Sequence, residues 1–257
     1  MATLAGSLLM GTVGGIVAGA LVGALMGVFA TRYRVDQVVL GVVINLLVLG
    51  LTTYLYSSVM QLDAARFNDP EVFGRFDIPL LSDLPVLGRL LFSQNLLVYL
   101  AVVVVVVVHV MLHHSQWGLR TRAVGEHPRA ADTLGIDVNR LRFSNCVLAG
   151  AVAGLAGAYL TIGSVGEFGA NMSAGRGYIA LAAVIFGRWT PLGAMGAALL
   201  FSFATSIKTL LAIIGAPVEI HGQLLEMLPY VVTIVIVAGA VGRAAAPAAI
   251  GRPYVKG

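Results

Sequence analysis

The chain contains few charged residues and almost no cysteine. Asp, Glu, Lys and Arg together make up 11% of its 257 residues, whereas hydrophobic residues make up 58%, far from the composition of an average soluble domain. The single cysteine, Cys146, excludes an internal disulfide framework. The net charge of +4 is small and scattered among loops, so it does not suggest nucleic acid as a partner. The composition indicates a membrane protein that crosses the bilayer several times.

Several motifs that carry chemistry are also missing. The chain has no Gly-x-x-x-x-Gly-Lys-Ser/Thr loop, so it does not itself bind nucleotide phosphates in the P-loop manner. It has no Gly-x-Ser-x-Gly motif that would suggest a hydrolase. His109, His113 and His114 have metal-like spacing, but no acid or cysteine lies near them in sequence. We therefore expect a protein that is not an enzyme and that binds neither a metal nor a cofactor.

Seven apolar segments are candidates for membrane spans, because a bilayer core about 30 Å thick requires about 20 apolar residues in a helix. The fifth is short: Tyr178 to Gly187 covers about half a span by that rule, which favours a re-entrant or broken helix. The predicted fold is an all-α, polytopic transmembrane helical bundle that forms a single domain over residues 1–257. The predicted segments are residues 6–30, 38–60, 95–113, 143–163, 177–187, 192–214 and 227–242.

The distribution of arginine and lysine predicts the orientation of the helices, because basic residues concentrate in cytoplasmic loops. Residues 31–37, 114–142 and 188–193 and the C-terminal tail fall on one side of the predicted bundle and carry basic residues with few acids. On the other side, which includes residues 61–92, acidic residues dilute the arginines. We therefore expect residues 61–92 to be extracytoplasmic, and residues 114–142 and the C-terminus to be cytoplasmic.

The polar groups at membrane depth are almost all uncharged. The acidic residues lie at span ends or in loops, whereas an ion-coupled carrier normally keeps a carboxylate near the middle of the bilayer. Lys208 is the one charge inside a span, and its long side chain favours snorkelling to the outer interface over a contact with substrate. Uncharged groups bind neutral, hydroxyl-rich solutes without desolvating a charge, although they also join helices. The candidate pathway residues are Asn45, Ser202, Thr205, Ser206 and Lys208, with Thr52 and Thr53 at similar depth.

Small residues recur at helical spacing in two of the spans. Such stripes let helices approach closely, and we expect them to pack within one subunit rather than between subunits. The first stripe is Gly11, Gly15, Gly19, Gly23 and Gly27, and the second face is Ala149, Ala153 and Gly157 beside Gly150 and Gly154.

Four stretches of sequence carry a family resemblance. They are GLRTRAVGEHPRAADTLGIDVNRLR, LAGAVAGLAGAYLTIG, FGANMSAGRGYIALAAVIFGRWTPLGAMGAALLF, and MLPYVVTIVIVAG with APAAIGRPYVKG. Together they resemble the permease subunits of bacterial ABC importers for simple sugars and nucleosides, and the nucleoside-type branch most of all. The resemblance extends from about Arg34 to the C-terminus and is interrupted by the loop 61–92.

The resemblance implies a role for the hydrophilic loop 114–142. In such permeases this loop contains the coupling helix, which docks into a cleft on the ATPase and transmits its closing motion to the membrane helices. The local sequence fits a short helix from Pro128 to Leu134, because proline is favoured at the first position of a helix and glycine just after its end. By resemblance, the ATPase contact consists of Gly125, Glu126, Pro128, Arg129, Ala130, Ala131, Asp132 and Gly135.

The resemblance also implies the remaining parts of an importer in the bacterial cytoplasmic (inner) membrane. The expected partners are a second permease subunit, two cytoplasmic ABC ATPase subunits, an extracytoplasmic substrate-binding (lipo)protein and membrane lipid. The expected cargo is a nucleoside or a simple sugar, carried by alternating access.

Three alternatives remain open at this stage: a branched-chain amino acid ABC permease, an ATP-independent channel or secondary carrier, and a non-transporting remnant. Members of the family usually begin with further membrane segments and a motif resembling ERSGVVNIGLEG, which is not found in this sequence. The resemblance therefore predicts that N-terminal segments usual in the family are lacking.

Overall fold

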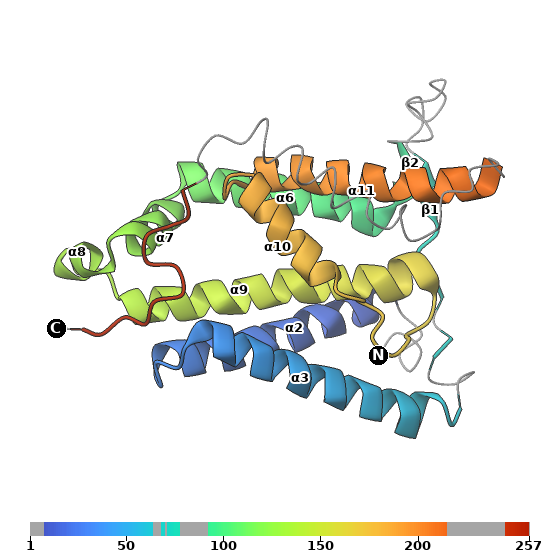
Figure 1. The fold of residues 1–257 in the computed structure, drawn as a ribbon, viewed down its shortest axis with the longest axis horizontal. Coiled ribbons are helices and arrows are strands. Elements are labelled where there is room, and N and C mark those ends of the chain that lie inside the picture. Colours follow the sequence, from blue (N-terminus) through green and yellow to red (C-terminus); the bar gives the residue numbers. More distant parts are fainter. Residues whose placement is uncertain (1–7, 64–67, 70, 78–91, 215–244, 257) are drawn as a thin grey trace.

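The computed structural model describes residues 8–63, 68–69, 71–77, 92–214 and 245–256. Within these residues, four helical segments are long and apolar enough to cross a membrane, and two shorter apolar helices follow. The predicted all-α, polytopic class is therefore confirmed (Figure 1). The four long segments are α2 (Leu8–Thr31), α3 (Gln37–Leu55) continued by the π-helical turn η1 (Tyr56–Met60), α6 (Leu96–His114), and α9 (Val138–Ala158) continued by η2 (Tyr159–Val165). The two shorter apolar helical stretches are α10 (Arg176–Phe186) and the part Pro191–Ser206 of α11 (Pro191–Ile214).

The predicted number of seven membrane segments is not confirmed, because four helical segments qualify as spans among the described residues. The predicted span 227–242 lies outside the described residues. The span predicted at 143–163 begins too late, because α9 starts at Val138, where the carboxylate of Asp137 accepts a 2.9 Å hydrogen bond from the backbone N–H of Arg140. A capping side chain of this kind satisfies the free N–H groups at a helix start, so a helix can begin outside the apolar stretch.

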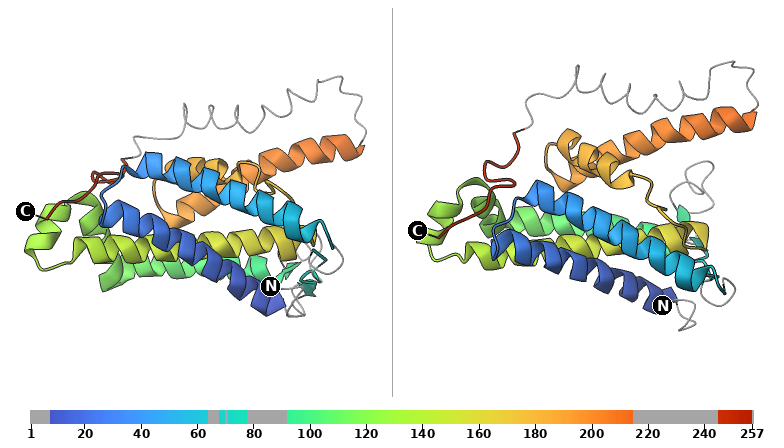
Figure 2. Two further views of the ribbon diagram at one scale, coloured as in Figure 1. Left: turned by 90° about the horizontal axis from the view of Figure 1, so that it is seen from below. Right: turned by 60° about the horizontal axis from the view of Figure 1, so that its bottom comes forward.

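Helices α2 and α9 pack antiparallel against each other, with glycine backbones in the seam (Figures 1 and 2). A Cβ atom added to Gly19 would lie 2.7 Å from the Cα of Gly154, and one added to Gly150 would lie 2.9 Å from the Cα of Gly23. Nothing larger than hydrogen fits at these positions without moving a backbone. Four glycines of the predicted first stripe, from residue 15 to residue 27, therefore pack inside one chain, as expected.

The second predicted small-residue face is only partly used in this seam. Gly150 and Gly154 face α2, whereas a Cβ at Gly157 would meet open space, and Ala149 and Ala153 are exposed. Adjacent residues of a helix point about 100° apart, so the row of Ala149, Ala153 and Gly157 lies to one side of the row that faces α2. That this first row also packs within one subunit stays a prediction.

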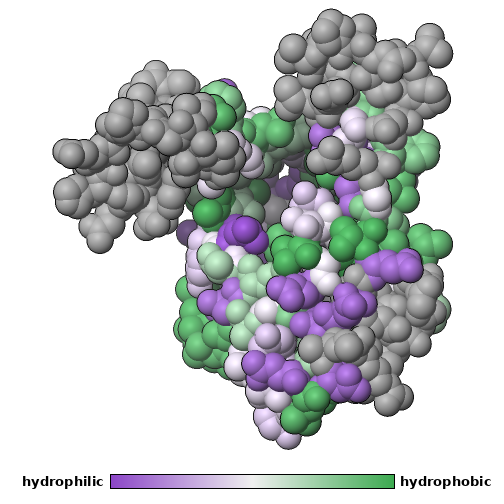
Figure 3. Space-filling model, turned by 90° about the vertical axis from the view of Figure 1, so that its right-hand side faces the viewer, coloured by the Kyte–Doolittle hydropathy of each residue, from purple (hydrophilic) through white to green (hydrophobic). Residues whose placement is uncertain are grey.

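The end of the bundle predicted to be extracytoplasmic contains a short antiparallel pair of strands. Strands β1 (Arg75–Asp77) and β2 (Ser93–Asn95) pair with Arg75 opposite Asn95. The side-chain amide of Asn95 donates to the carbonyls of Phe73 (2.8 Å) and Gly163 (3.0 Å), and its oxygen caps Leu97 N–H. One residue thus joins the strand pair, the start of α6 and η2. Hydrophilic residues gather on this end of the molecule (Figure 3).

Helices α10 and α11 form a pair on one side of the bundle, and α11 contacts α6 (Figures 1 and 2). At 11 residues, α10 rises about 16 Å, which is too short to cross a bilayer core of about 30 Å. The rings of Phe186 and Phe201 meet edge to face with their centroids 5.5 Å apart. A Cβ at Gly193 would lie 2.6 Å from the hydroxyl oxygen of Thr190 and would also collide with the backbone of Gly187, so the turn between the helices is tight.

Candidate functional site

The hydrophilic connector between the third and fourth long helices is folded, and most of it is helical. It contains α7 (Gln116–Glu126) and α8 (Pro128–Thr133). At the corner between α6 and α7, the hydroxyl of Ser115 accepts a 3.1 Å hydrogen bond from Gly118 N–H. A Cβ at Gly118 would collide with the carbonyl groups of Met111 and Leu112. The corner therefore requires glycine and sets the direction in which α7 leaves the membrane helix.

Helix α8 has the start and the end that the sequence predicted. Pro128 occupies its first turn, and Leu134 is its C-cap. Gly135 follows with φ of +83°, in the left-handed region. Its N–H bonds the carbonyl of Asp132 (2.9 Å), and the N–H of Ile136 bonds that of Ala131 (3.1 Å). This pair of bonds is the Schellman arrangement, which requires a left-handed residue and satisfies carbonyls that α8 would otherwise leave free.

A small apolar cluster holds α7, α8, α9 and the C-terminal segment together. It consists of Val124, Ala131, Val138 and Tyr254, with side chains between 1% and 8% exposed. Ile136 and Leu141 pack against its edge. Because each of the four buried residues comes from a different segment, the cluster fixes α8 against the first turn of α9.

Polar contacts attach the C-terminal segment, residues 245–256, to the same end of the bundle. The backbone N–H of Ala249 donates to the carbonyl of Gly125 (2.9 Å). The N–H of Ala248 donates to Oε2 of Glu126 (3.3 Å).

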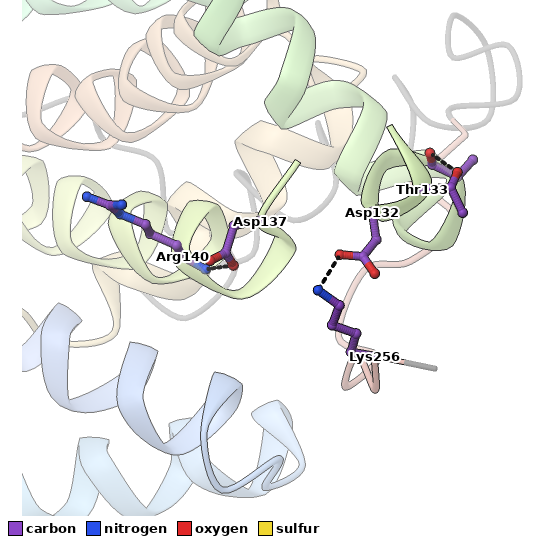
Figure 4. Close-up of polar contacts among 6 residues, drawn as sticks. Asp132, Thr133, Asp137, Arg140 and Lys256 are labelled. Carbon is purple, nitrogen blue, oxygen red and sulfur yellow. Dashed lines mark hydrogen bonds and ion pairs between the residues drawn. The ribbon is translucent and has the colours of Figure 1, made fainter. Parts of the chain in front are cut away.

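Two further contacts lie closer to the end of the chain. The guanidinium of Arg142 donates to the carbonyl of Arg252 at 2.7 Å. The ammonium of Lys256 lies 3.8 Å from the carboxylate of Asp132 (Figure 4). Because the Lys256 side chain is 74% exposed, this pair contributes little stability by itself. The buried tyrosine and the backbone hydrogen bonds carry the attachment.

The surroundings of Tyr254 shift the pKa of its phenol. Desolvation raises its pKa above the ordinary value of 10.0, and a hydrogen bond to the nearby carboxylate of Asp132 raises it further. Arg129 and Arg142 act in the opposite direction with a smaller effect. The tyrosine therefore stays protonated and donates to Asp132 at neutral pH.

The predicted ATPase-contact residues divide into an outward-facing and an inward-facing group. Glu126, Arg129 and Ala130 are exposed, whereas Ala131 is 2% exposed and lies in the apolar cluster. Gly125 and Asp132 contact the C-terminal segment. The structure brings the whole predicted set together at one end of the bundle, but only part of it can contact another protein.

Sequence reasoning missed two residues of this site. Leu134, at the end of α8, is 82% exposed although it is a leucine within a hydrophilic stretch. Tyr254 is 8% exposed although it lies in a tail rich in Gly, Pro and charged residues. In both cases a lone large apolar side chain among small and polar residues was the available signal.

Three of the five candidate pathway residues line one cavity between α10 and α11. The cavity has a volume of about 420 Å³, and its walls include Ser202, Thr205, Ser206 and the N-terminal residue of α10, Arg176. The hydroxyls of Thr205 and Ser206 donate to carbonyls one turn earlier, at 2.9 and 2.8 Å. Their oxygens still have lone pairs with which to accept a hydrogen bond from a solute.

Of the other two candidates, Asn45 lies elsewhere and the side chain of Lys208 is not described. Asn45 is exposed on α3 and is not part of this cavity. Lys208 belongs to α11, but its side chain lies outside the described part of the structure.

On α6, the rings of His109 and His113 stack with their centroids 4.4 Å apart. No group of three His, Cys, Asp or Glu residues suited to a metal ion occurs among the described residues.

The fold and the folded connector at one end define a multi-pass membrane protein. Over residues 1–249 the sequence matches the family described as "Branched-chain amino acid transport system / permease component". It is 40% identical over 232 residues to the guanosine ABC transporter permease protein NupQ of Bacillus subtilis. The matched region covers 89% of this chain and 72% of that protein. The chain therefore belongs to this permease family.

Two further relatives agree with this assignment. The nucleoside ABC transporter permease protein NupC of Lactococcus lactis is 40% identical over 234 residues, again 89% of this chain and 72% of that protein. The putative glucose ABC transporter permease protein TsgC13 of Haloferax volcanii is 35% identical over 175 residues, 67% of this chain and 52% of that protein. No solved structure matches the chain. These relatives are transport subunits by name, in agreement with the permease family to which the chain belongs.

Proposed function

We propose that the chain is the permease subunit of an ATP-driven importer of nucleosides. The observation that carries this proposal is the 40% identity to a guanosine permease and to a nucleoside permease, each over 89% of the chain. The cavity between α10 and α11 supports it, because hydroxyls and a single arginine suit a neutral solute rich in hydrogen-bonding groups.

The contacts of α8 support a mechanical route from an ATPase into the membrane. The buried pair Ala131 and Val138 joins α8 to the start of α9, and α9 is packed backbone to backbone against α2. A push on the exposed face of α8, at Arg129 and Ala130, would therefore move α9 and α2 together, because close-packed interfaces transmit displacement with little compression. Alternating access would follow from that movement.

The proposed assembly consists of this subunit, a second permease subunit, two cytoplasmic ABC ATPases and an extracytoplasmic binding protein in a bacterial cytoplasmic membrane. In this orientation α7, α8 and the C-terminus lie in the cytoplasm, and residues 61–92 lie outside. The structure supports one part of this arrangement: residues 245–256 pack against α7, α8 and α9, so they share one end of the bundle.

A branched-chain amino acid is a second candidate cargo, favoured by the description of the matched family. Such a solute is a zwitterion, and it needs both an anionic and a cationic partner or equivalent helix ends. The described cavity offers Arg176 for a carboxylate but has no acid among its lining residues. The cavity therefore favours the nucleoside.

Uptake by the intact importer tests the proposal. The permease is expressed with its cognate ATPase, second permease and binding protein in a strain without nucleoside uptake, and entry of labelled guanosine is followed. We expect uptake that requires ATP and that excess uridine reduces but excess leucine does not. Inhibition of uptake by leucine but not by uridine would mean that the cargo is an amino acid and not a nucleoside. Uptake in vesicles without ATP would contradict the ABC mechanism.

A further inference from the structure

The C-terminal segment has one buried side chain, and aliphatic and basic side chains on either side of it face solvent. Tyr254 is 8% exposed, whereas Ile250 and Val255 are 50% and 52% exposed, and Arg252 is exposed as well. The backbone of the segment is held in place by hydrogen bonds to the carbonyl of Gly125 and to the guanidinium of Arg142. The outward side chains are therefore presented from a backbone that is already ordered.

A groove of about 610 Å³ runs between α8 and this segment. Three arginines from three different parts of the chain line it: Arg129 of α8, Arg142 of α9 and Arg252 of the C-terminal segment. Glu126 is the one acid in its lining, and its carboxylate already accepts a hydrogen bond from Ala248 N–H. The groove is thus basic, with apolar Val255 at its border.

We propose that the C-terminal segment is the second wall of the docking site for the ATPase, and that the groove between it and α8 receives a carboxylate-bearing segment of that ATPase. This inference rests on the proposed function, which supplies an ATPase at this end of the bundle. The surface on which it rests differs from α8 itself, because its outward residues Ile250, Arg252 and Val255 come from the end of the chain.

The chemistry of this surface agrees with a protein partner. Arginine is enriched at protein interfaces, and a basic groove selects acidic segments through charge complementarity. An ordered backbone also lowers the entropy lost on docking.

Site-specific photocrosslinking in the assembled importer tests the proposal. A photoreactive residue is placed at Val255, at Ala130 on the exposed side of α8, or at Tyr33, which is 63% exposed after α2 and serves as the background position. We expect Val255 to crosslink to the ATPase about as well as Ala130 does, and at least about tenfold better than Tyr33.

The outcomes separate the two claims. If Ala130 crosslinks and Val255 does not exceed Tyr33, the C-terminal segment is no part of the docking site and the inference is overturned. If neither Ala130 nor Val255 crosslinks, the coupling role of α8 in the proposed function fails as well.

A charge substitution tests the chemistry of the groove. Arg252→Glu should weaken binding of the purified ATPase to the permease in neutral-lipid nanodiscs by about tenfold, and Arg252→Lys should retain most of it. Only the carbonyl of Arg252 is used by Arg142, so the backbone contact survives both substitutions. Unchanged ATPase binding by Arg252→Glu, with reduced binding of anionic lipid vesicles instead, would assign the groove to lipid headgroups and contradict the proposal.

Discussion

The backbone N–H of Ala249 donates a 2.9 Å hydrogen bond to the carbonyl oxygen of Gly125. Gly125 lies in the last turn of α7, where carbonyl groups have no partner within the helix. The end of the chain therefore completes the end of a helix more than a hundred residues earlier in the sequence. The connector and the C-terminal segment are therefore one structural unit.

Replacing Tyr254 by alanine should release the C-terminal segment. The substitution removes the only buried side chain of that segment, so its hydrogen bonds to Gly125 and Arg142 should open more often. We expect hydrogen exchange at the Ala249 amide to rise by about tenfold or more, with little change in α2. Tyr254→Phe keeps the ring and is the matched control. Equal exchange in wild type and Tyr254→Ala would show that the tyrosine does not anchor the segment.

The phenol of Tyr254 should have a pKa above 10.0 in the folded protein, because desolvation and the Asp132 carboxylate both favour its protonated form. A raised pKa contributes stability that is present below pH 10.0 and is lost as the pH rises through the folded value. The difference between ultraviolet titrations of wild type and Tyr254→Phe isolates this residue. Asp132→Asn should move the midpoint of that difference downward, and a midpoint at or below 10.0 in the unsubstituted protein would refute the assignment.

Two glycines on the same helix should respond oppositely to alanine. At Gly150 the new methyl group would press on the backbone of α2, and overpacking of this kind costs about 1–3 kcal/mol. At Gly157 the methyl would meet open space, and alanine favours the helix by about 1 kcal/mol. Thermal unfolding in detergent measures both. A Gly150→Ala protein as stable as Gly157→Ala would mean that the close seam between α2 and α9 does not form.

Much of this fold could be predicted from the residues, for identifiable reasons. Apolar runs located the long helices, and the four-residue spacing of glycines located the seam, because both signals depend on local periodicity. The start and end of α8 were predictable from Pro128 and Gly135 for the same reason.

The remaining features depend on contacts between distant residues. No local pattern indicates that Tyr254 packs on Ala131, or that Asn95 bridges to Gly163. The start of α9 was misplaced because hydrophobicity indicates only which residues can lie in the bilayer core, whereas the cap residue Asp137 determines where the helix begins. Of the candidate pathway residues, Ser202, Thr205 and Ser206 on α11 share a cavity, but Asn45 on α3 resembled them only in polarity and predicted depth.

The hydroxyl of Thr205 should matter for the affinity of the solute. Thr205→Val keeps the shape of the side chain and removes the hydroxyl of a residue that lines the cavity. Loss of one hydrogen bond predicts a KM for guanosine that rises about two- to tenfold at unchanged kcat. Thr52→Val on α3 is the control, because Thr52 makes the same kind of hydrogen bond one turn back (2.8 Å) outside the cavity. Equal KM values for the two variants would exclude a direct contact.

Binding of the ATPase to charge-reversed permeases tests the central claim most directly, namely that α8 is the point at which the ATPase acts on the membrane helices. Arg129→Glu and Arg122→Glu both reverse an exposed arginine, but only Arg129 lies on α8. The account predicts that Arg129→Glu inserts normally into the membrane, loses capture of the cognate ATPase and abolishes nucleoside uptake, while Arg122→Glu retains most of both. ATPase capture and uptake at wild-type levels in Arg129→Glu would contradict it.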